Sequence, residues 1–315
     1  MPDYKWTRKG LLLPVKAGHQ WWASHAQSPT VLALSSRLWR IYFAGRDAGN
    51  LSSMMAVDVD PLDGMRILAE HLDAIMVPGP PGTFDSSGLG PSCALIIGGR
   101  IHLYYSGIYP RLDVRTQLAI GLAISDDGLT FERISPGPVR GIGPKDPYFV
   151  STPFVSAIEG GYRMWYTSGT GWMDVDGSRE PVYGIRSCIS EDGILWETGS
   201  SLCLHEDADE GASLTRPWVT QGDDGMRLWY SRRGKQFRNG GNEAYRLFSR
   251  RINARGDIVG EAEPVIFSNS PVAGDFDSWM QAYGCVMQCA SGEVMFYNGN
   301  GFGQDGIGWA TRDLR

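Results

Sequence analysis

The stretch Arg163-Met-Trp-Tyr-Thr-Ser-Gly169 guides the interpretation of the whole chain, because it occurs in five similar copies. The other four copies are Arg40-Ile-Tyr-Phe-Ala-Gly45, His102-Leu-Tyr-Tyr-Ser-Gly107, Arg227-Leu-Trp-Tyr-Ser-Arg232 and Val294-Met-Phe-Tyr-Asn-Gly299. The second aromatic residues of the copies are Phe43, Tyr105, Tyr166, Tyr230 and Tyr297. They are separated by 62, 61, 64 and 67 residues. Self-similarity at such a regular period indicates a repeat architecture.

A second marker recurs in step with the aromatic block. It lies 13 or 14 positions before each aligned aromatic residue, at Pro29, Pro91, Pro153, Pro217 and, in the fifth copy, Gly284. Two markers at a constant spacing through 315 residues indicate five related structural units.

Each unit has the pattern of four β-strands. The first strand follows the proline, the second carries the aromatic block, and the third is exemplified by 117–125. The fourth follows an Asp-Gly turn in the segments 125–132 and 190–197, and Asp-Gly is a favoured connection between antiparallel strands. Four-stranded antiparallel sheets repeated around an axis are typical of propellers. We therefore predict an all-β fold, a five-bladed β-propeller.

The two ends of the chain predict how the repeat closes. The last unit has no fourth strand after Trp309, whereas the segment 4–13 precedes the first unit and resembles such a strand. We expect this N-terminal strand to close the last blade and remove an exposed sheet edge. No Pro-rich, Ser-rich or low-complexity linker interrupts the sequence, so we expect residues 1–315 to form a single domain.

Composition excludes several classes of function. The net charge of −6 argues against nucleic acid as a partner, because phosphate contacts need clustered Lys and Arg. No apolar run approaches the roughly 20 residues that span a bilayer, and the first residues do not resemble a signal peptide. The five cysteines include no CxxC pair and are expected to be buried free thiols. These features predict a cytoplasmic protein without a membrane partner.

The repeat places acidic residues at one register. Loops that lead into the first strands of a propeller open on the same face as loops that join second and third strands. Six or seven positions before the proline marker, four units carry an acid: Asp85, Asp146, Glu210 and Asp277. The first unit has no acid there but offers His25, whose ordinary pKa suits a general base at neutral pH. We take these five as candidate catalytic residues.

Other residues of the same loops are candidates for substrate binding. Arginines beside acids suggest an anionic group on the ligand, held in a bidentate fork, and a tryptophan can stack on a sugar ring. The candidates are Arg46, Asp47, Trp172, Arg216, Arg232, Arg233, Asn298 and Asn300. The predicted partner is thus a small sugar or sugar phosphate.

Structural alternatives exist for most of these residues. An acid before a strand often accepts hydrogen bonds from a turn, and the arginines can pair with those acids. His25 can also be a plain hydrogen-bonding residue or a metal ligand, and a tryptophan can belong to the core. No zinc, EF-hand, P-loop, dinucleotide-binding or GxSxG motif occurs, so the sequence predicts neither a cofactor nor a metal site.

The repeat length, the aromatic-Tyr-Ser-Gly strands and the Ser-x-Asp-Gly hairpins resemble the five-bladed propeller enzymes of carbohydrate metabolism. These are the arabinanase, levansucrase and invertase superfamily and the related mannoside phosphorylases. The chain more closely resembles bacterial proteins described as glycoside-hydrolase-like. That likeness is carried by the segments 24–29, 82–85, 146–153 and 297–308.

The chain departs from the hydrolase pattern of that superfamily. The hydrolases carry an acid near the first inner strand, where this chain has Ala26-Gln-Ser-Pro29. A Trp-Ala-Pro-Asp type motif is replaced by Gly88-Leu-Gly-Pro-Ser92, and Ser151-Thr-Pro153 lacks the glutamate before its proline. The phosphorylases use one acid and a phosphate held by basic residues, which the acids and arginines of this chain match better.

Three functions remain in view. The first is an enzyme of glycosidase or phosphorylase type that acts on a small, anionic sugar by acid/base catalysis. The second is a lyase, cyclase or epimerase of a phosphorylated or nucleotide-linked sugar. The third is a sugar-binding propeller without catalytic activity.

Overall fold

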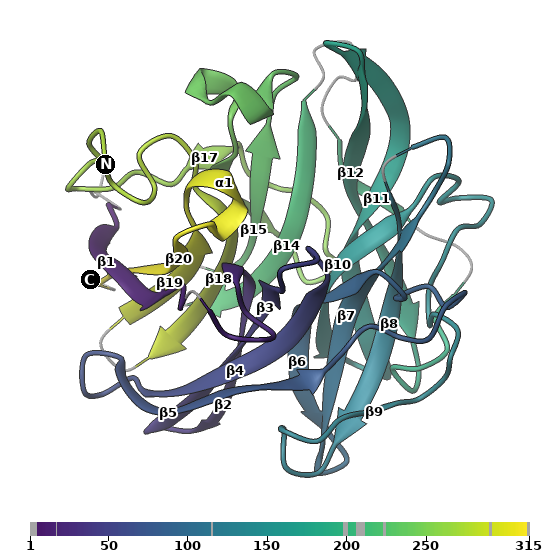
Figure 1. Ribbon diagram of the computed structural model, residues 1–315, viewed down its shortest axis with the longest axis horizontal. Coiled ribbons are helices and arrows are strands. Elements are labelled where there is room, and N and C mark those ends of the chain that lie inside the picture. The colour runs from purple at the N-terminus through teal and green to yellow at the C-terminus, as the bar shows by residue number, and fades with distance from the viewer. Residues whose placement is uncertain are drawn as a thin grey trace.

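The computed structural model is almost entirely β-structure, with the strand groups arranged like wedges around a centre (Figure 1). It describes residues 5–16, 18–114, 116–197, 201–205, 212–222, 225–289 and 292–313. No helix in these ranges is both long enough and apolar enough to cross a membrane.

The strands pair in antiparallel groups that follow chain order. The first group is β2 (Ser24–Ser35), β3 (Leu38–Arg46), β4 (Ser52–Asp60) and β5 (Arg66–Met76). The second is β6 (Gly88–Ile97), β7 (Arg100–Pro110), β8 (Thr116–Ser125) and β9 (Glu132–Arg133). One parallel pair, Ser52 with Gly88, joins these two groups into an eight-stranded sheet.

Two further groups form separate four-stranded sheets. The third is β10 (Val150–Ile158), β11 (Gly161–Val175), β12 (Ser178–Ser190) and β13 (Ser201–Leu204). The fourth is β14 (Ser213–Gly222), β15 (Gly225–Arg233), β16 (Arg246–Ile252) and β17 (Glu263–Pro264). Short helical turns, η2 (Phe237–Asn239) and η3 (Gly241–Glu243), lie between β15 and β16.

The last group joins the two ends of the chain. It consists of β18 (Ala282–Cys289), β19 (Gly292–Asn298), β20 (Gly306–Arg312) and β1 (Thr7–Pro14), with α1 (Asn300–Gly303) between β19 and β20. Strand β1 pairs antiparallel with β20, from Thr7 opposite Thr311 to Pro14 opposite Gly306. The predicted closure of the last sheet by an N-terminal strand is confirmed.

The first strands of the groups surround a common axis. Strand β2 contacts β6, β6 contacts β10, β10 contacts β14, β14 contacts β18, and β18 contacts β2. In each of these strands the pairing register shifts at the proline marker or its glycine equivalent. Proline has no N–H for the ladder, so a bulge at this point leaves no donor unpaired. Four residues just before the marker have positive φ angles: Ser28, Thr152, Arg216 and Tyr283.

The Ser-x-Asp-Gly segments form a turn that fastens neighbouring groups. In one copy, Ser125 Oγ accepts the N–H of Gly128, and Asp127 Oδ1 accepts those of Leu129 and Thr130. The hydroxyl of Tyr42, in the first group, donates to the Gly128 carbonyl at 3.0 Å. The other copy repeats the arrangement with Ser190, Asp192, Gly193 and Tyr104.

This turn corrects one expectation about the fourth strands. We expected them to follow the Asp-Gly pair directly, but β9 begins only at Glu132, and residues 194–197 of the other copy lie outside any strand. The aspartate side chain takes the N–H groups of the two residues after the glycine, so these residues do not enter the ladder.

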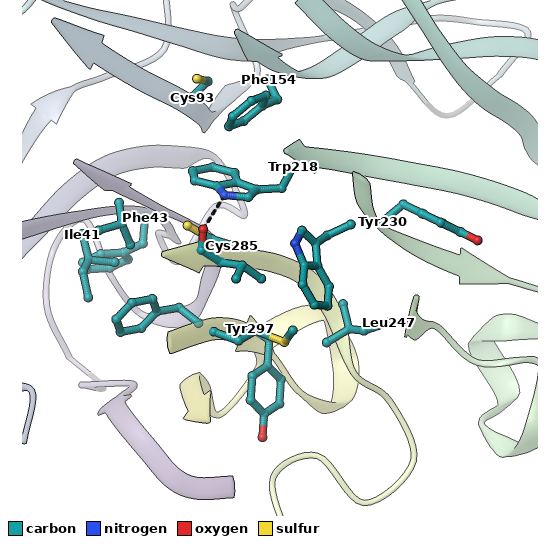
Figure 2. Close-up of a cluster of buried hydrophobic side chains, with 14 of the residues drawn as sticks. Ile41, Phe43, Cys93, Phe154, Trp218, Tyr230, Leu247, Cys285 and Tyr297 are labelled. Atoms are coloured by element: carbon teal, nitrogen blue, oxygen red, sulfur yellow. Dashed lines mark hydrogen bonds between the residues drawn. The ribbon is translucent and has the colours of Figure 1, made fainter. Parts of the chain in front are cut away.

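Aromatic side chains fill the space between the groups (Figure 2). The Trp218 ring packs against Phe154 with ring centroids 4.8 Å apart, and its indole N–H donates to the Val286 carbonyl at 2.7 Å. This one side chain therefore links three groups. All five cysteines are free thiols; Cys93, Cys188 and Cys285 are buried, and the others are partly buried.

Candidate active site

The predicted catalytic acid Asp277 lies in a buried ion pair within the last group. Arg8 of β1 donates to both of its carboxylate oxygens, at 2.9 Å from Nε and 2.5 Å from Nη2. The Tyr297 hydroxyl of β19 donates to Oδ2 at 2.7 Å. The Asp277 side chain is fully shielded from solvent. Its partners thus come from the strand that closes the fold and from the repeated aromatic block.

The same Asp–Tyr–Arg cluster recurs in two other groups. Its members are Asp85 with Tyr105 and Arg133, and Asp146 with Tyr166 and Arg140. In both clusters the arginine lies 2.6–2.7 Å from the carboxylate, and the tyrosine hydroxyl lies 3.0–3.1 Å from it. Both acids are buried. The register shared by these acids therefore coincides with a repeated internal hydrogen-bond network.

The first group shows the converse case. Where the other groups have the acid and the tyrosine, it has Trp22 and Phe43, whose rings pack with centroids 5.0 Å apart. The acid is thus absent where the hydroxyl is absent. This co-variation was already visible in the sequence, and it is the signal that would have identified the acids as partners of the tyrosines. The remaining predicted acid, Glu210, lies outside the described residues.

A central pocket of about 330 Å³ opens where the first strands meet. It is lined by hydroxyl side chains, aromatic rings and two arginines: Gln27, Ser28, Ala44, Arg46, Ser52, Leu89, Gly90, Ser92, Ser106, Ile108, Leu118, Phe149, Ser151, Thr152, Thr167, Pro181, Tyr183, Thr215, Phe237, Arg238, Tyr245, Tyr283 and Phe302. Among the described residues, no carboxylate lines this pocket. The carboxylate oxygens of Asp85, Asp146 and Asp277 bond tyrosine and arginine side chains and do not line the pocket. A catalytic role for these acids therefore stays a prediction.

Hydroxyl groups form the polar part of the pocket wall. Thr167 Oγ1 lies 2.6 Å from Thr152 Oγ1 and 2.9 Å from Thr215 Oγ1. Ser106 Oγ accepts the N–H of Thr152 at 2.8 Å. Hydroxyls both donate and accept hydrogen bonds, so this surface matches the hydroxyl groups of a sugar. These residues were not predicted from the sequence, although Ser106 and Thr167 directly follow the aligned tyrosines.

Arg46 is the predicted binding residue that does line the pocket. It lies at the end of β3, where Nε donates to Gln27 Oε1 at 2.9 Å and Nη1 to Asn50 Oδ1 at 3.2 Å. Burial lowers the pKa of its guanidinium. Within the described ranges, Arg46 has no carboxylate at ion-pair distance. A half-buried cation held only by neutral amides is ready to receive an anion.

Another part of the pocket wall is aromatic. The hydroxyls of Tyr183 and Tyr245 hydrogen-bond to each other, and Arg233 donates to Tyr183 at 2.9 Å from Nε. The Arg233 guanidinium also lies 4.0 Å from the centre of the Phe237 ring. Arg233 was a predicted binding residue; the structure buries it behind the pocket, where it positions the aromatic wall. Tyr245 and Phe237 lie on segments outside the repeated blocks, which gave no signal in the sequence.

Arg238 completes the polar rim beside the aromatic wall. Its guanidinium forms a bidentate pair with the buried Glu180, at 2.6 Å and 3.0 Å. The Glu180 carboxylate is thus neutralised, and it does not line the pocket.

Arg216 crosses the axis beneath the pocket. Its side chain leaves β14 and donates to the carbonyls of Pro29 and Pro91, at 2.8 Å and 3.0 Å, and to Thr30 Oγ1 at 2.8 Å. Burial lowers the pKa of this guanidinium to about 10. The predicted binding residue Arg216 thus ties three first strands together and does not line the pocket.

The remaining predicted residues lie around the pocket. Asp47 accepts a backbone N–H within its own loop, and Asn300 accepts that of Trp279 in the segment before β18. Asn298 bonds the backbone of Ser28 and Ala26. The guanidinium of Arg232 lies 5.8 Å from the centre of the Phe248 ring. Trp172 lies beside Phe149, which lines the pocket, but faces a separate hollow. None of these five residues lines the central pocket.

His25 lies near Arg46 in a left-handed conformation with φ of 57°. Its Nδ1 lies 2.9 Å from Ser24 Oγ. Burial, and secondarily the charge of Arg46, lowers the pKa of His25 to about 4. The imidazole is therefore neutral at neutral pH and a weaker base than an ordinary histidine, and it does not line the central pocket.

This pKa predicts how stability depends on pH. Between pH 4 and 6.5 the unfolded chain binds a proton at His25 that the folded chain does not, so stability falls as the pH drops through this window. We expect His25→Gln to lose less stability than the wild type between pH 7 and pH 4.5, as measured by urea unfolding. His205→Gln, at an exposed site, is the control. Parallel pH profiles for wild type and His25→Gln would contradict a depressed pKa.

Comparison with known proteins places the chain in a wider group. No family model matches it. It is 32% identical to the uncharacterized protein Rv1502 of Mycobacterium tuberculosis over 97% of this chain and 98% of the relative. It is 28% identical to a β-1,2-mannobiose phosphorylase of Thermoanaerobacter sp., over 38% of this chain and 40% of that protein.

A solved structure supports the fold. It comes from a study of the GH130 family of mannoside phosphorylases, which contains glycoside hydrolases that target β-1,2-mannosidic linkages in Candida mannan. The TM-score is 0.71 at 12% identity, over 100% of this chain and 98% of that chain. The resemblance to glycoside-hydrolase-like propellers is confirmed. The chain belongs to the same family as the uncharacterized protein Rv1502 of Mycobacterium tuberculosis.

Proposed function

We propose that the protein is a carbohydrate-active enzyme whose central pocket binds a small sugar carrying an anionic group. The observation that carries this proposal is Arg46, a half-buried cation at the pocket wall. Among the described residues, its side-chain partners are the amides of Gln27 and Asn50. The pocket volume of about 330 Å³ lies at the small end of the range for ligand sites. The hydroxyl groups and aromatic rings of the pocket wall suit the edge and the face of one sugar ring.

Phosphorolysis is the reaction type that this pocket supports best. In that reaction the glycosidic C–O bond breaks, an oxygen of hydrogen phosphate forms the new bond to the sugar carbon, and the leaving oxygen takes the proton that the phosphate gives up. The phosphate replaces the second carboxylate that hydrolysis requires, and Arg46 is placed to hold it. The similarity to a mannobiose phosphorylase over part of the chain supports the same reaction class.

A lyase, cyclase or epimerase acting on a phosphorylated sugar is the second candidate. The position of the His25 imidazole near Arg46 favours it, because such reactions need a base beside the bound anion. For either enzyme we propose that the chain is a single domain. We interpret its four-stranded groups as five blades around the pocket.

Calorimetric titration with mannose 1-phosphate and with mannose tests the anionic pocket. We expect the phosphorylated sugar to bind at least tenfold more tightly, because it adds charge-assisted hydrogen bonds to Arg46. Equal affinity would overturn the proposal. Release of mannose 1-phosphate from β-1,2-mannobiose, dependent on inorganic phosphate, would identify the phosphorylase. Binding without turnover of any phosphorylated sugar would identify a sugar-binding protein.

A further inference from the structure

A second hollow of about 350 Å³ lies between the β7–β8 loop and the β11–β12 hairpin. Strands β11 and β12, of 15 and 13 residues, are longer than the corresponding strands of the other groups, and their hairpin projects at the upper right of Figure 1. The hollow is lined mainly by Arg111, Gln117, Tyr148, Trp172, Asp174 and Arg179. The function proposed above makes no use of it.

This side hollow adjoins the central pocket. Gln117 and Tyr148 line the side hollow, whereas their chain neighbours Leu118 and Phe149 line the central pocket. The rings of Trp172 and Phe149 lie 6.1 Å apart at their centroids. Residues 117–118 and 148–149 therefore form a wall between two neighbouring hollows.

The chemistry of the side hollow differs from that of the central pocket. Arg111 pairs with Asp113 through two bonds of 2.9 Å, and Arg179 lies 4.0 Å from Asp174. These exposed pairs cancel in charge, so the hollow does not select an anion. They offer donors and acceptors at its edge, while the exposed ring of Tyr148 and the half-buried ring of Trp172 offer flat apolar faces. Hydroxyl groups around an apolar ring face are what an uncharged sugar presents.

We propose that the side hollow binds the second, uncharged sugar ring of the substrate, stacked on Trp172. This inference rests on the proposed function, because the first ring occupies the central pocket. It assigns the substrate to disaccharides or sugar conjugates whose second unit is an uncharged sugar.

The indole N–H signal of Trp172 in a nitrogen–proton NMR spectrum tests the inference directly, and Trp172→Phe assigns that signal. We expect β-1,2-mannobiose to shift the Trp172 signal, with the signals of the buried Trp165 and Trp218 serving as internal controls. An unchanged Trp172 signal at saturating mannobiose would overturn the inference. A shift caused by uridine but not by mannobiose would also overturn it, because the hollow would then accept a nucleobase.

Binding of two ligands to Trp172→Ala supplies a second measurement. We expect the mutation to weaken mannobiose binding about fivefold more than mannose 1-phosphate binding, because only the larger ligand loses a stacking partner. Trp172→Phe should restore most of the difference. Equal weakening of both ligands would show that Trp172 acts through Phe149, and would overturn the inference. Failure of the proposed function would give a different result: Arg46→Gln would then bind mannose 1-phosphate as tightly as the wild type.

Discussion

Replacement of Arg46 by glutamine should weaken the binding of mannose 1-phosphate by about 30-fold or more. Removing one partner of a buried, hydrogen-bonded charge pair typically costs about 2–5 kcal/mol of binding free energy, and each 1.4 kcal/mol corresponds to about tenfold. Glutamine keeps hydrogen-bonding capacity towards Gln27 and Asn50, so the local loop has partners in the variant. Calorimetric titration measures the change.

Two controls make this result specific to the charge at the pocket. The affinity for uncharged mannose should change much less in Arg46→Gln, because the anion contact is absent. Arg100→Gln removes an exposed arginine that pairs with Asp126, away from the pocket lining, and should leave both affinities unchanged. If Arg46→Gln binds mannose 1-phosphate as tightly as the wild type, the anion is held elsewhere and the proposed function fails.

Asp277→Asn should lower the free energy of unfolding by about 3–5 kcal/mol, because it leaves the Arg8 guanidinium beside a neutral side chain in the interior. Tyr297 would also lose its charged acceptor. Urea unfolding of the purified variant measures the change. Asp275→Asn is a matched control: Asp275 also bonds Arg8, at 3.0 Å, but its side chain is 34% exposed. Such a pair contributes less than about 1 kcal/mol.

The same pair of variants decides whether Asp277 takes part in catalysis. If Asp277 has only a structural role, the Asp277→Asn variant should bind mannose 1-phosphate like the wild type at a low temperature at which it remains folded. A variant of normal stability that has lost turnover would instead show that Asp277 is the catalytic acid, in agreement with the prediction from its register.

The fold was largely predictable because its signals repeat. The aromatic blocks became second strands, the proline markers became the bulges of first strands, and the N-terminal segment closed the last sheet. The fourth strands were less predictable. The residue at which a fourth strand begins depends on how many backbone N–H groups the Asp127 or Asp192 side chain accepts. The sequence pattern does not show that number.

The candidate site was predictable only in part. Arg46 was identified from its place after a second strand and lines the pocket. The register of Asp85 and Asp146 was identified correctly, but register fixes a position along the chain and not the direction of a side chain. A tyrosine hydroxyl and an arginine supply the strongest partners within reach, so these carboxylates face inwards. Tyr245 and Phe237 were missed because non-repeated segments bring them to the pocket.

The pairing of β1 with β20 has a consequence for the newly synthesised chain. These strands lie about 300 residues apart in the sequence, so at typical translation rates β1 waits roughly 15–60 seconds on the ribosome before its partner exists. During that interval its open edge is a target for non-native pairing, and the charges of Arg8 and Lys9 discourage it. Arg8 then finds Asp277 as the last sheet forms. Arg8 thus first opposes non-native pairing of β1 and later stabilises the sheet in which β1 pairs with β20.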